Sequence, residues 1–209
     1  MEHYLHASAI INFDAPAVLA CARELARGNA GAIEIARRCF VFVRDEIRHS
    51  WDHRMNPVTL RASDVLAHRT GYCYAKSHLL AALLRANGIP AGLCYQRLAL
   101  DESAKPFCLH GLNAVFLDGF GWYRMDARGN KPGVEAHFDP PRERLAFIPE
   151  AAGEADLPGI WIEPLKCVIR ALSGCGDFEV LRRNLPDLLP EEFPTGAAVE
   201  WTPREPEKK

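Results

Sequence analysis

The most constraining feature of this chain is a long apolar stretch that ends in a clear stop signal. Residues 79–84 read Leu-Leu-Ala-Ala-Leu-Leu, and Gly88-Ile89-Pro90 follows soon after. A stretch that is apolar nearly all round is typical of a helix buried in the centre of a domain. Glycine just past the last turn, with proline beyond it, is common where helices end. We therefore expect a buried central helix that starts near Cys73 and ends before Gly88.

The residues after this helix change from a helical to a strand-like pattern. Residues 91–100, 107–117 and 120–126 are expected to be strands, and residues 101–106 a polar turn. Asp118-Gly119 is a hairpin turn signal between the second and third strands. Helices followed by an antiparallel meander predict an α+β fold, with the central helix packed on the sheet.

Weaker signals predict the other elements of the first 70 residues. Capping residues, Pro and Gly breaks and apolar spacing indicate a strand, three helices and a loop. These are a strand within His3–Phe13, a helix over Ala15–Arg27 capped by Asp14, a helix with its apolar stripe from Ile33 to Ile47, a loop over His49–Arg61, and a short helix from Ser63 to near Arg69.

The composition changes after Asp126, where glycines and prolines become frequent. We expect mostly loop over 128–159, a late strand at Cys167–Ile169, a short helix capped by Asp177 and running through Asn184, and a frayed end over 203–209. Residues 1–140 are predicted to form the core. Residues 141–209 are predicted to be a C-terminal extension packed on that core rather than a separate domain.

Charge and cysteine content narrow the class of protein. The 209 residues carry a net charge of −2 with scattered Lys and Arg, so we expect no nucleic-acid partner. We expect no signal peptide and no membrane partner, because the N-terminal residues lack a basic start followed by an apolar run and no apolar run is long enough for a membrane span. Seven cysteines without a Cys-x-x-Cys pair favour a reducing compartment, which predicts a cytoplasmic protein without structural disulfides. The oligomeric state is not predicted.

Three residues could form a cysteine acyl-transfer site. Cys73 lies at a helix start, where unpaired N–H groups and the helix dipole favour a thiolate, and Gly71 allows a substrate to approach. His110 lies in the second predicted strand and Asp126 in the third, side by side across the hairpin. A carboxylate on one imidazole nitrogen would leave the other for the thiol. Each residue alone is also typical of an ordinary core position.

These segments resemble the transglutaminase-like superfamily, of bacterial type. The resemblance is carried by Gly71-Tyr72-Cys73 with residues 80–90, by residues 110–117, and by residues 121–126, which include a Gly-Trp pair before the acid. It covers roughly Ile33 to Asp126 and implies a papain-like core with Cys73 as nucleophile, His110 as base and acid, and Asp126 as the orienting carboxylate. Leu112, Ala114, Gly92 and Ala127-Arg128 depart from the family pattern, and these positions line or support its cleft.

The resemblance implies acyl transfer through a thioester on a peptide, protein or small amide, as in a protease, an amidase or a transglutaminase. We expect no cofactor and no metal. Two alternatives stay open: an N-acyltransferase that uses a thioester donor, and an inactive binding domain of the same fold.

Trp51, Tyr72 and Trp122 are candidate walls of a substrate cleft, although core packing accounts equally well for such aromatics. His49 and His53 have a metal-like spacing, but they fall in a predicted loop without a third ligand. That loop could instead flank the cleft and supply a second oxyanion donor. Cys108 lies two residues before His110, so the two side chains are expected on the same face of the strand. We expect Cys108 to be a packing residue, with redox or zinc roles as alternatives.

Overall fold

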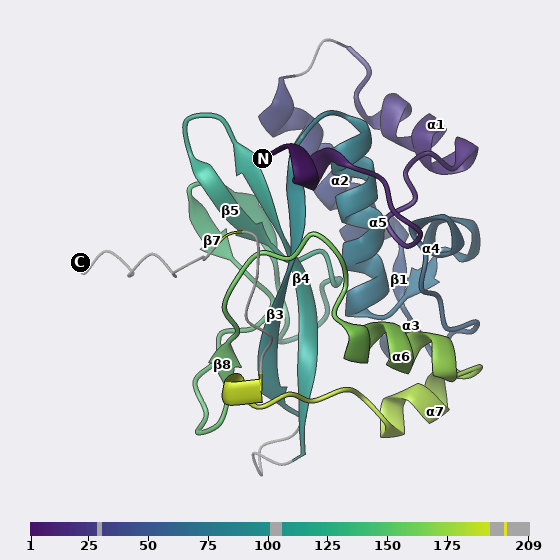
Figure 1. Ribbon diagram of the computed structural model, residues 1–209, viewed down its shortest axis with the longest axis vertical. Helices are drawn as coiled ribbons and strands as arrows, with labels where there is room; N and C mark the ends of the chain where they lie inside the picture. The colour runs from purple at the N-terminus through teal and green to yellow at the C-terminus, as the bar shows by residue number, and fades with distance from the viewer. Residues whose placement is uncertain (29–30, 101–105, 193–198, 200–209) are drawn as a thin grey trace.

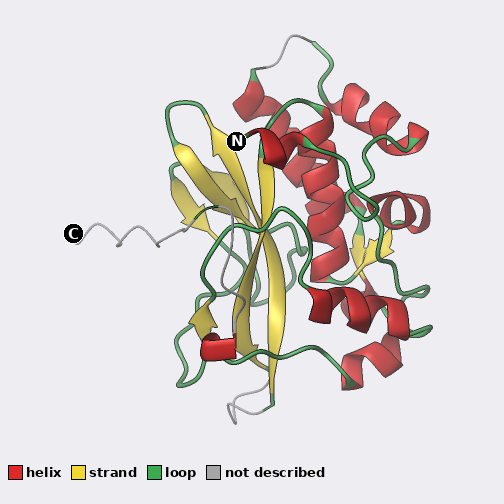
Figure 2. Cartoon of the chain, viewed as in Figure 1, coloured by secondary structure: helices red, strands yellow, loops and turns green. Residues whose placement is uncertain are grey.

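The α-helices lie on one side of the molecule and the main sheet on the other (Figures 1 and 2). The computed structural model describes residues 1–28, 31–100, 106–192 and 199. Its α-helices are α1 (Pro16–Leu25), α2 (Ala32–Glu46), α3 (Ser50–His53), α4 (Ala62–His68), α5 (Cys73–Ala86), α6 (Lys166–Gly174) and α7 (Phe178–Arg183), with 3₁₀ turns at Glu2–Leu5 and Pro190–Glu192. None of these helices is long and apolar enough to cross a membrane.

Within the described residues, the strands form three sheets. The main sheet is antiparallel, in the order β5-β4-β3-β8, a β1–β2 pair is parallel, and β6–β7 is a hairpin. The bounds are β1 (Arg48–His49), β2 (Thr70–Gly71), β3 (Ala91–Ala99), β4 (Phe107–Leu117), β5 (Gly121–Met125), β6 (His137–Asp139), β7 (Arg142–Arg144) and β8 (Ala155–Asp156).

Helix α5 is the centre of the core. Every residue from Cys73 to Arg85 is buried, as the apolar sequence predicts. Helices α1, α2 and α4 contact α5 on one side, and β3 and β4 contact it on the other. Burial on all sides removes the apolar surface of the whole helix from water and stabilises the helix between these elements. The position of the helix in turn sets the position of Cys73, its first residue. The predicted α+β, papain-like arrangement is confirmed.

The meander is also confirmed in order and direction. Strands β3 and β4 pair with Ala91 opposite Val115 and Ala99 opposite Phe107, and β4 pairs with β5 through Asn113 and Met125. The predicted turn at 101–106 lies, except for Pro106, outside the described residues, as does the predicted frayed end at 203–209.

Two strand predictions are wrong. The first segment forms a 3₁₀ turn over Glu2–Leu5 and then coil, because Tyr4 packs inward and its hydroxyl donates to the Ile160 carbonyl. The segment that contains Cys167–Ile169 is helix α6. Val168 and Leu172, four residues apart, are buried on one helical face, so tertiary packing overrode a short apolar run.

Several boundary predictions need correction too. The loop predicted for His49–Arg61 contains the end of β1 and the short helix α3. Helices α1 and α4 lack the predicted caps from Asp14 and Ser63, since their N-caps are Ala15 and Arg61. Three short strands, β6, β7 and β8, interrupt the predominantly irregular stretch over 128–159. Asp177 does cap α7, and its side chain accepts from the Glu179 N–H.

The chain after residue 140 contacts both the sheet and the helices. The Leu109 N–H donates to the Pro186 carbonyl at 2.7 Å, Arg97 pairs with Asp187 at 2.7 Å, and the Tyr72 hydroxyl donates to the Phe178 carbonyl. The predicted division into a core over 1–140 and a packed extension over 141–209 stays a prediction, since part of that extension lies outside the described residues.

Candidate active site

Cys73 is the first residue of α5, at the point where the helix meets the sheet. Its N-cap residue, Tyr72, makes no side-chain capping bond, so no side chain competes for the backbone N–H groups of the first turn. The turn before it is tightly packed, because a Cβ at Gly71 would lie 3.1 Å from the Ala75 Cβ. The Cys73 thiol is largely buried but borders a cavity.

Gly111 brings this helix start against strand β4. A Cβ at Gly111 would lie 3.1 Å from the Tyr74 Cα and 3.3 Å from the Tyr74 nitrogen, so a larger residue would push the helix away. The Tyr74 hydroxyl donates to the Leu109 carbonyl and holds the same contact from the helix side. The Gly111 N–H donates to the Cys73 Sγ at 3.5 Å, which places the sulfur beside His110.

His110 and Asp126 come together because β4 and β5 pair just before the acid. Asp126 follows Met125, the last residue of β5, and its Oδ2 lies 2.7 Å from the His110 Nε2. The Arg128 N–H donates to the Asp126 Oδ1 at 3.0 Å, and the Ala146 N–H donates to Oδ2 at 3.3 Å. The carboxylate is therefore fixed by neutral donors as well as by the imidazole. Contact with Nε2 leaves Nδ1 of His110 for another partner.

The charges at this end of the cavity favour an imidazolium. Burial by itself lowers the pKa of His110, but charge interactions and hydrogen bonds with Asp126 and Cys73 raise it to about 10. Burial likewise raises the pKa of Asp126, yet the His110 charge and the bonds from His110 and Arg128 hold it below its usual value. The pair is thus a buried proton donor and its counter-ion, next to a sulfur.

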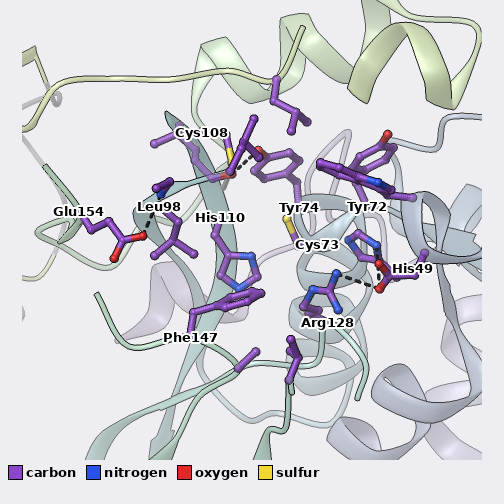
Figure 3. Close-up of a pocket in the computed structure, with 18 of the residues that line it drawn as sticks. His49, Tyr72, Cys73, Tyr74, Leu98, Cys108, His110, Arg128, Phe147 and Glu154 are labelled. Atoms are coloured by element: carbon purple, nitrogen blue, oxygen red, sulfur yellow. Dashed lines mark hydrogen bonds and ion pairs between the residues drawn. The ribbon is translucent and has the colours of Figure 1, made fainter. Parts of the chain in front are cut away.

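Cys73 and His110 open onto a cavity of about 550 Å³ (Figure 3). Its lining is mixed: apolar groups such as Leu98, Tyr74 and Phe147 adjoin the charged side chains of Arg128 and Lys131. The Phe147 ring packs edge-on against His110, with 5.0 Å between ring centroids. A sulfur and an imidazolium at the wall of this cavity, with a buried carboxylate behind the imidazolium, can carry out acyl transfer with the reacting groups largely shielded from bulk water.

Comparison with protein families identifies the chain. A model described as the transglutaminase-like superfamily matches residues 19–127, just over half of the 209 residues. The chain belongs to the transglutaminase-like superfamily. The match includes Cys73, His110 and Asp126, and it confirms the family resemblance inferred from the sequence. Membership supports a cysteine-dependent function of the protease or transglutaminase kind.

Solved structures give distant similarities. A candidate cysteine protease from Cytophaga hutchinsonii is 21% identical with a TM-score of 0.46, and the match covers 60% of this chain and 40% of that one. The periplasmic domain of TgpA from Pseudomonas aeruginosa is 24% identical with a TM-score of 0.45, with coverages of 59% and 45%. This superfamily member therefore spans less than half the length of either. A search of curated protein sequences found no match.

The cavity contains two of the three aromatic residues predicted for a cleft. Trp51 and Tyr72 line it together with Cys73 and His110. Trp122 is not among the described residues that line it, because it lies at the start of β5 and its ring packs 4.8 Å from the Tyr4 ring. Trp122 and Asp126 are four residues apart, an even spacing that places side chains on the same face of a strand. The spacing also places Trp122 farther along the strand, away from the cavity.

Sequence reasoning gave no site role to Phe147 and Asp52, and it noted Arg128 only as a departure from the family pattern at a position that lines or supports the cleft. Arg128 reaches the cavity and pairs with Asp52 at 2.8 Å, and Lys131 pairs with the same carboxylate at 2.8 Å. Phe147 comes from the irregular stretch after β7, where no local pattern indicates a site residue.

The histidine pair at 49 and 53 does not converge. His49 is buried in the cavity wall, while His53 is exposed. Within the described ranges, no group of three or more His, Cys, Asp and Glu side chains is arranged to hold a metal ion. Cys108 also lines the cavity, and burial raises the pKa of its thiol to about 12, so it is a protonated neighbour at neutral pH.

Proposed function

We propose that this protein transfers acyl groups through a thioester on Cys73, starting from an amide or peptide substrate. The observation that carries the proposal is the 2.7 Å contact between His110 Nε2 and Asp126 Oδ2, with the Cys73 Sγ held at 3.5 Å from the adjacent Gly111 nitrogen. In this proposal Cys73 is the nucleophile, His110 the general acid and base, and Asp126 the residue that orients the imidazole.

The reaction then proceeds in two halves. The Cys73 sulfur attacks the carbonyl carbon, the C–N bond breaks, and His110 gives its proton to the departing amine. An acceptor next attacks the thioester while His110 takes the acceptor's proton, and the acyl group leaves the sulfur, which becomes a thiolate again. Water as acceptor makes the enzyme a protease or amidase, and an amine makes it a transglutaminase or an N-acyltransferase.

The substrate would lie in the cavity against Trp51 and Tyr72. These side chains are part of the wall beside Cys73, and the cavity is large enough for an amino-acid side chain and its flanking backbone. We therefore propose a peptide, protein or small amide as the substrate class. The steps above use only side chains of this chain.

Covalent labelling tests the nucleophile. Iodoacetamide at neutral pH should modify the wild-type protein fastest at Cys73, as located by peptide mass spectrometry. Cys73→Ala should remove this fast modification and all turnover of acyl substrates. Cys108→Ala is the matched control, because Cys108 lines the same cavity but carries a protonated thiol. Equal fast labelling of the Cys73→Ala variant would assign the reactive thiol to another cysteine.

An activated acyl donor separates the alternatives. An acetyl thioester should acetylate Cys73, and the product formed with and without an added amine reveals the acceptor. Transfer to an arylamine without hydrolysis of peptides would favour an N-acyltransferase. No acylation of Cys73 by any ester or thioester would favour a binding domain that keeps the fold without the chemistry.

A further inference from the structure

Arg128 is a largely buried cation in the cavity wall, and the proposed chemistry does not use its side chain. The side chain is 7% exposed and lines the cavity together with Cys73 and His110. The backbone N–H of Arg128 donates to the Asp126 carboxylate. Its guanidinium lies 5.6 Å from the centre of the Phe147 ring, which also packs on His110. Contacts of both backbone and side chain therefore hold this cation next to the proposed catalytic residues.

Within the described residues, the Arg128 guanidinium has more N–H donors than acceptors. Nη1 donates to the Gly129 carbonyl at 3.3 Å, and Nη2 forms an ion pair with the Asp52 Oδ2 at 2.8 Å. A guanidinium carries five N–H donors in a planar fork. Such a fork matches the two oxygens of a carboxylate. The side chain can therefore bind a carboxylate of a ligand while it keeps its contacts in the protein.

Positive charge exceeds negative charge at the Asp52 end of the cavity. Lys131 also lines the cavity and pairs with Asp52 at 2.8 Å, so two cations share one carboxylate. The histidine at this end, His49, is neutral because burial and nearby cations lower its pKa. Among the described lining residues, this end therefore has a net positive charge, which attracts an anionic group of a substrate.

The opposite side of the cavity is acidic. Glu150 and Glu154 line it, and the Glu154 carboxylate accepts from the Ala99 N–H at 2.9 Å. Figure 3 shows Glu154 and Arg128 on opposite sides of His110. A substrate carboxylate is attracted on one side and repelled on the other, so the charges of the cavity determine the orientation of such a substrate.

We propose that Arg128, assisted by Lys131, binds a carboxylate on the acyl part of the substrate, so that the preferred acyl groups are acidic. The inference rests on the proposed function and names its substrate class. Acylation removes the negative charge of the Cys73 thiolate but leaves both cations in place. A carboxylate on the acyl group restores the charge balance beside the thioester, whereas one on the departing amine would be lost at this step.

Esters of equal length with and without the charge test the proposal. The acidic substrates are the mono-p-nitrophenyl esters of succinic, glutaric and adipic acid, and the methyl ester of each is its neutral partner. The kcat/KM for acylation is measured from release of p-nitrophenol, after subtraction of the rate with Cys73→Ala. For at least one chain length, wild type should prefer the acid by about 10- to 100-fold, which is the gain from a hydrogen bond to a charged group. Equal values at all chain lengths would overturn the proposal.

Variants of Arg128 separate recognition from packing. Arg128→Gln keeps the length of the side chain but not its charge, and it should slow the acidic ester far more than the neutral one. Arg128→Lys keeps the charge without the fork and should retain part of the preference. Equal slowing of both esters in Arg128→Gln would overturn the proposal and give Arg128 a structural role. A wild-type preference in Arg128→Gln would also overturn it.

Two further variants decide the question if Arg128→Gln does not fold. Lys131→Gln changes a side chain that is 42% exposed, and it should lower the preference for the acidic ester by about 2- to 5-fold. Asp52→Asn removes the carboxylate that competes for both cations, so it should raise the preference. Changes in the same direction in these two variants, or no change in either, would contradict carboxylate binding at this end of the cavity.

The wild-type result distinguishes this inference from the proposed function. Acylation that is located on Cys73 and equally fast with acidic and neutral esters would leave acyl transfer intact and remove only the Arg128 assignment. A wild-type protein that forms no acyl-enzyme with either kind of ester would overturn both.

Discussion

The two ends of the cavity each pair a carboxylate with a buried histidine, yet the two histidines differ in charge. At one end Asp126 contacts His110 at 2.7 Å, and the pKa of His110 is raised to about 10 although burial lowers it. At the other end Asp52 is 3.5 Å from His49, and burial and nearby cations lower the pKa of His49. The same residue types thus give an imidazolium in one place and a neutral ring in the other.

The difference lies in what else each carboxylate binds. Besides His110, Asp126 accepts from two backbone N–H groups, which are neutral. Asp52 is shared between Arg128 and Lys131, whose positive charges also repel a proton on His49. Asp126 raises the pKa of His110 because it is buried and lies 2.7 Å away, whereas Asp52 is partly exposed, 3.5 Å from His49 and paired with two cations.

The largest expected effect comes from removing the dedicated carboxylate. Asp126→Asn should lower the acylation rate by about 10³–10⁴-fold, in line with loss of the orienting acid in a Ser-His-Asp triad. The pKa of His110 should fall from about 10 as its strongest partner is lost. Stopped-flow acylation and NMR titration of His110 measure the two effects.

Asp118→Asn is the matched control for this change, since Asp118 lies exposed in the hairpin turn before β5. If Asp126→Asn acylates as fast as Asp118→Asn, Asp126 does not orient His110 for catalysis.

Removing the shared carboxylate should instead reduce stability. In Asp52→Asn the Arg128 side chain, 7% exposed, loses its carboxylate partner, and breaking this partly buried pair should cost roughly 1–3 kcal/mol of unfolding free energy. Urea denaturation measures this change. Glu24→Gln breaks the exposed pair with Arg27, where the side chains are 78% and 60% exposed, and should change stability little. Similar effects of the two substitutions would mean that the Asp52 cluster is fully hydrated.

The two histidines should give opposite pH dependence of stability. The pKa of His110 is about 10 in the folded protein, above its usual value, so its contribution is complete below about pH 6.5 and is lost as pH rises through 10. The stability difference between wild type and His110→Gln should therefore shrink from pH 7 to pH 10. Urea unfolding across this range measures it, and a constant difference would contradict an imidazolium at His110.

For His49 the sign reverses, because the pKa in the folded protein lies below that of the unfolded chain. Below about pH 6.5 the unfolded state binds a proton that the folded state does not, so wild type should lose stability relative to His49→Gln as pH falls. A gain in wild-type stability toward acid would show that Asp52, not the cations, controls His49.

The smallest effect should come from the ring that covers His110. Phe147→Leu removes the edge-on aromatic contact but keeps an apolar side chain, and such contacts contribute about 0.5–1.5 kcal/mol. We expect acylation to slow by roughly 2- to 10-fold. Ile148→Leu, a change at an exposed neighbour on the same cavity wall, should leave the rate unchanged. Steady-state kinetics with one ester substrate compares the two.

The sequence alone determined the elements that bear the site. Residues 79–84 with Gly88 specify a buried helix from Cys73, and alternation with Asp118-Gly119 specifies the strands that carry His110 and Asp126. These are local signals, because side-chain period and turn chemistry act over a few residues. They also supported the family resemblance, which the match over residues 19–127 confirms.

Only the tertiary structure decided which groups meet and how their charges are divided. The approach of α5 to β4 depends on Gly111 facing Tyr74, and the lowered pKa of His49 depends first on burial and then on nearby cations such as Arg128. The helix α6 and the distance of Trp122 from the cavity likewise follow from long-range packing. Local patterns fix the conformation of each segment, but pKa values and cavity walls arise from contacts between residues far apart in the chain.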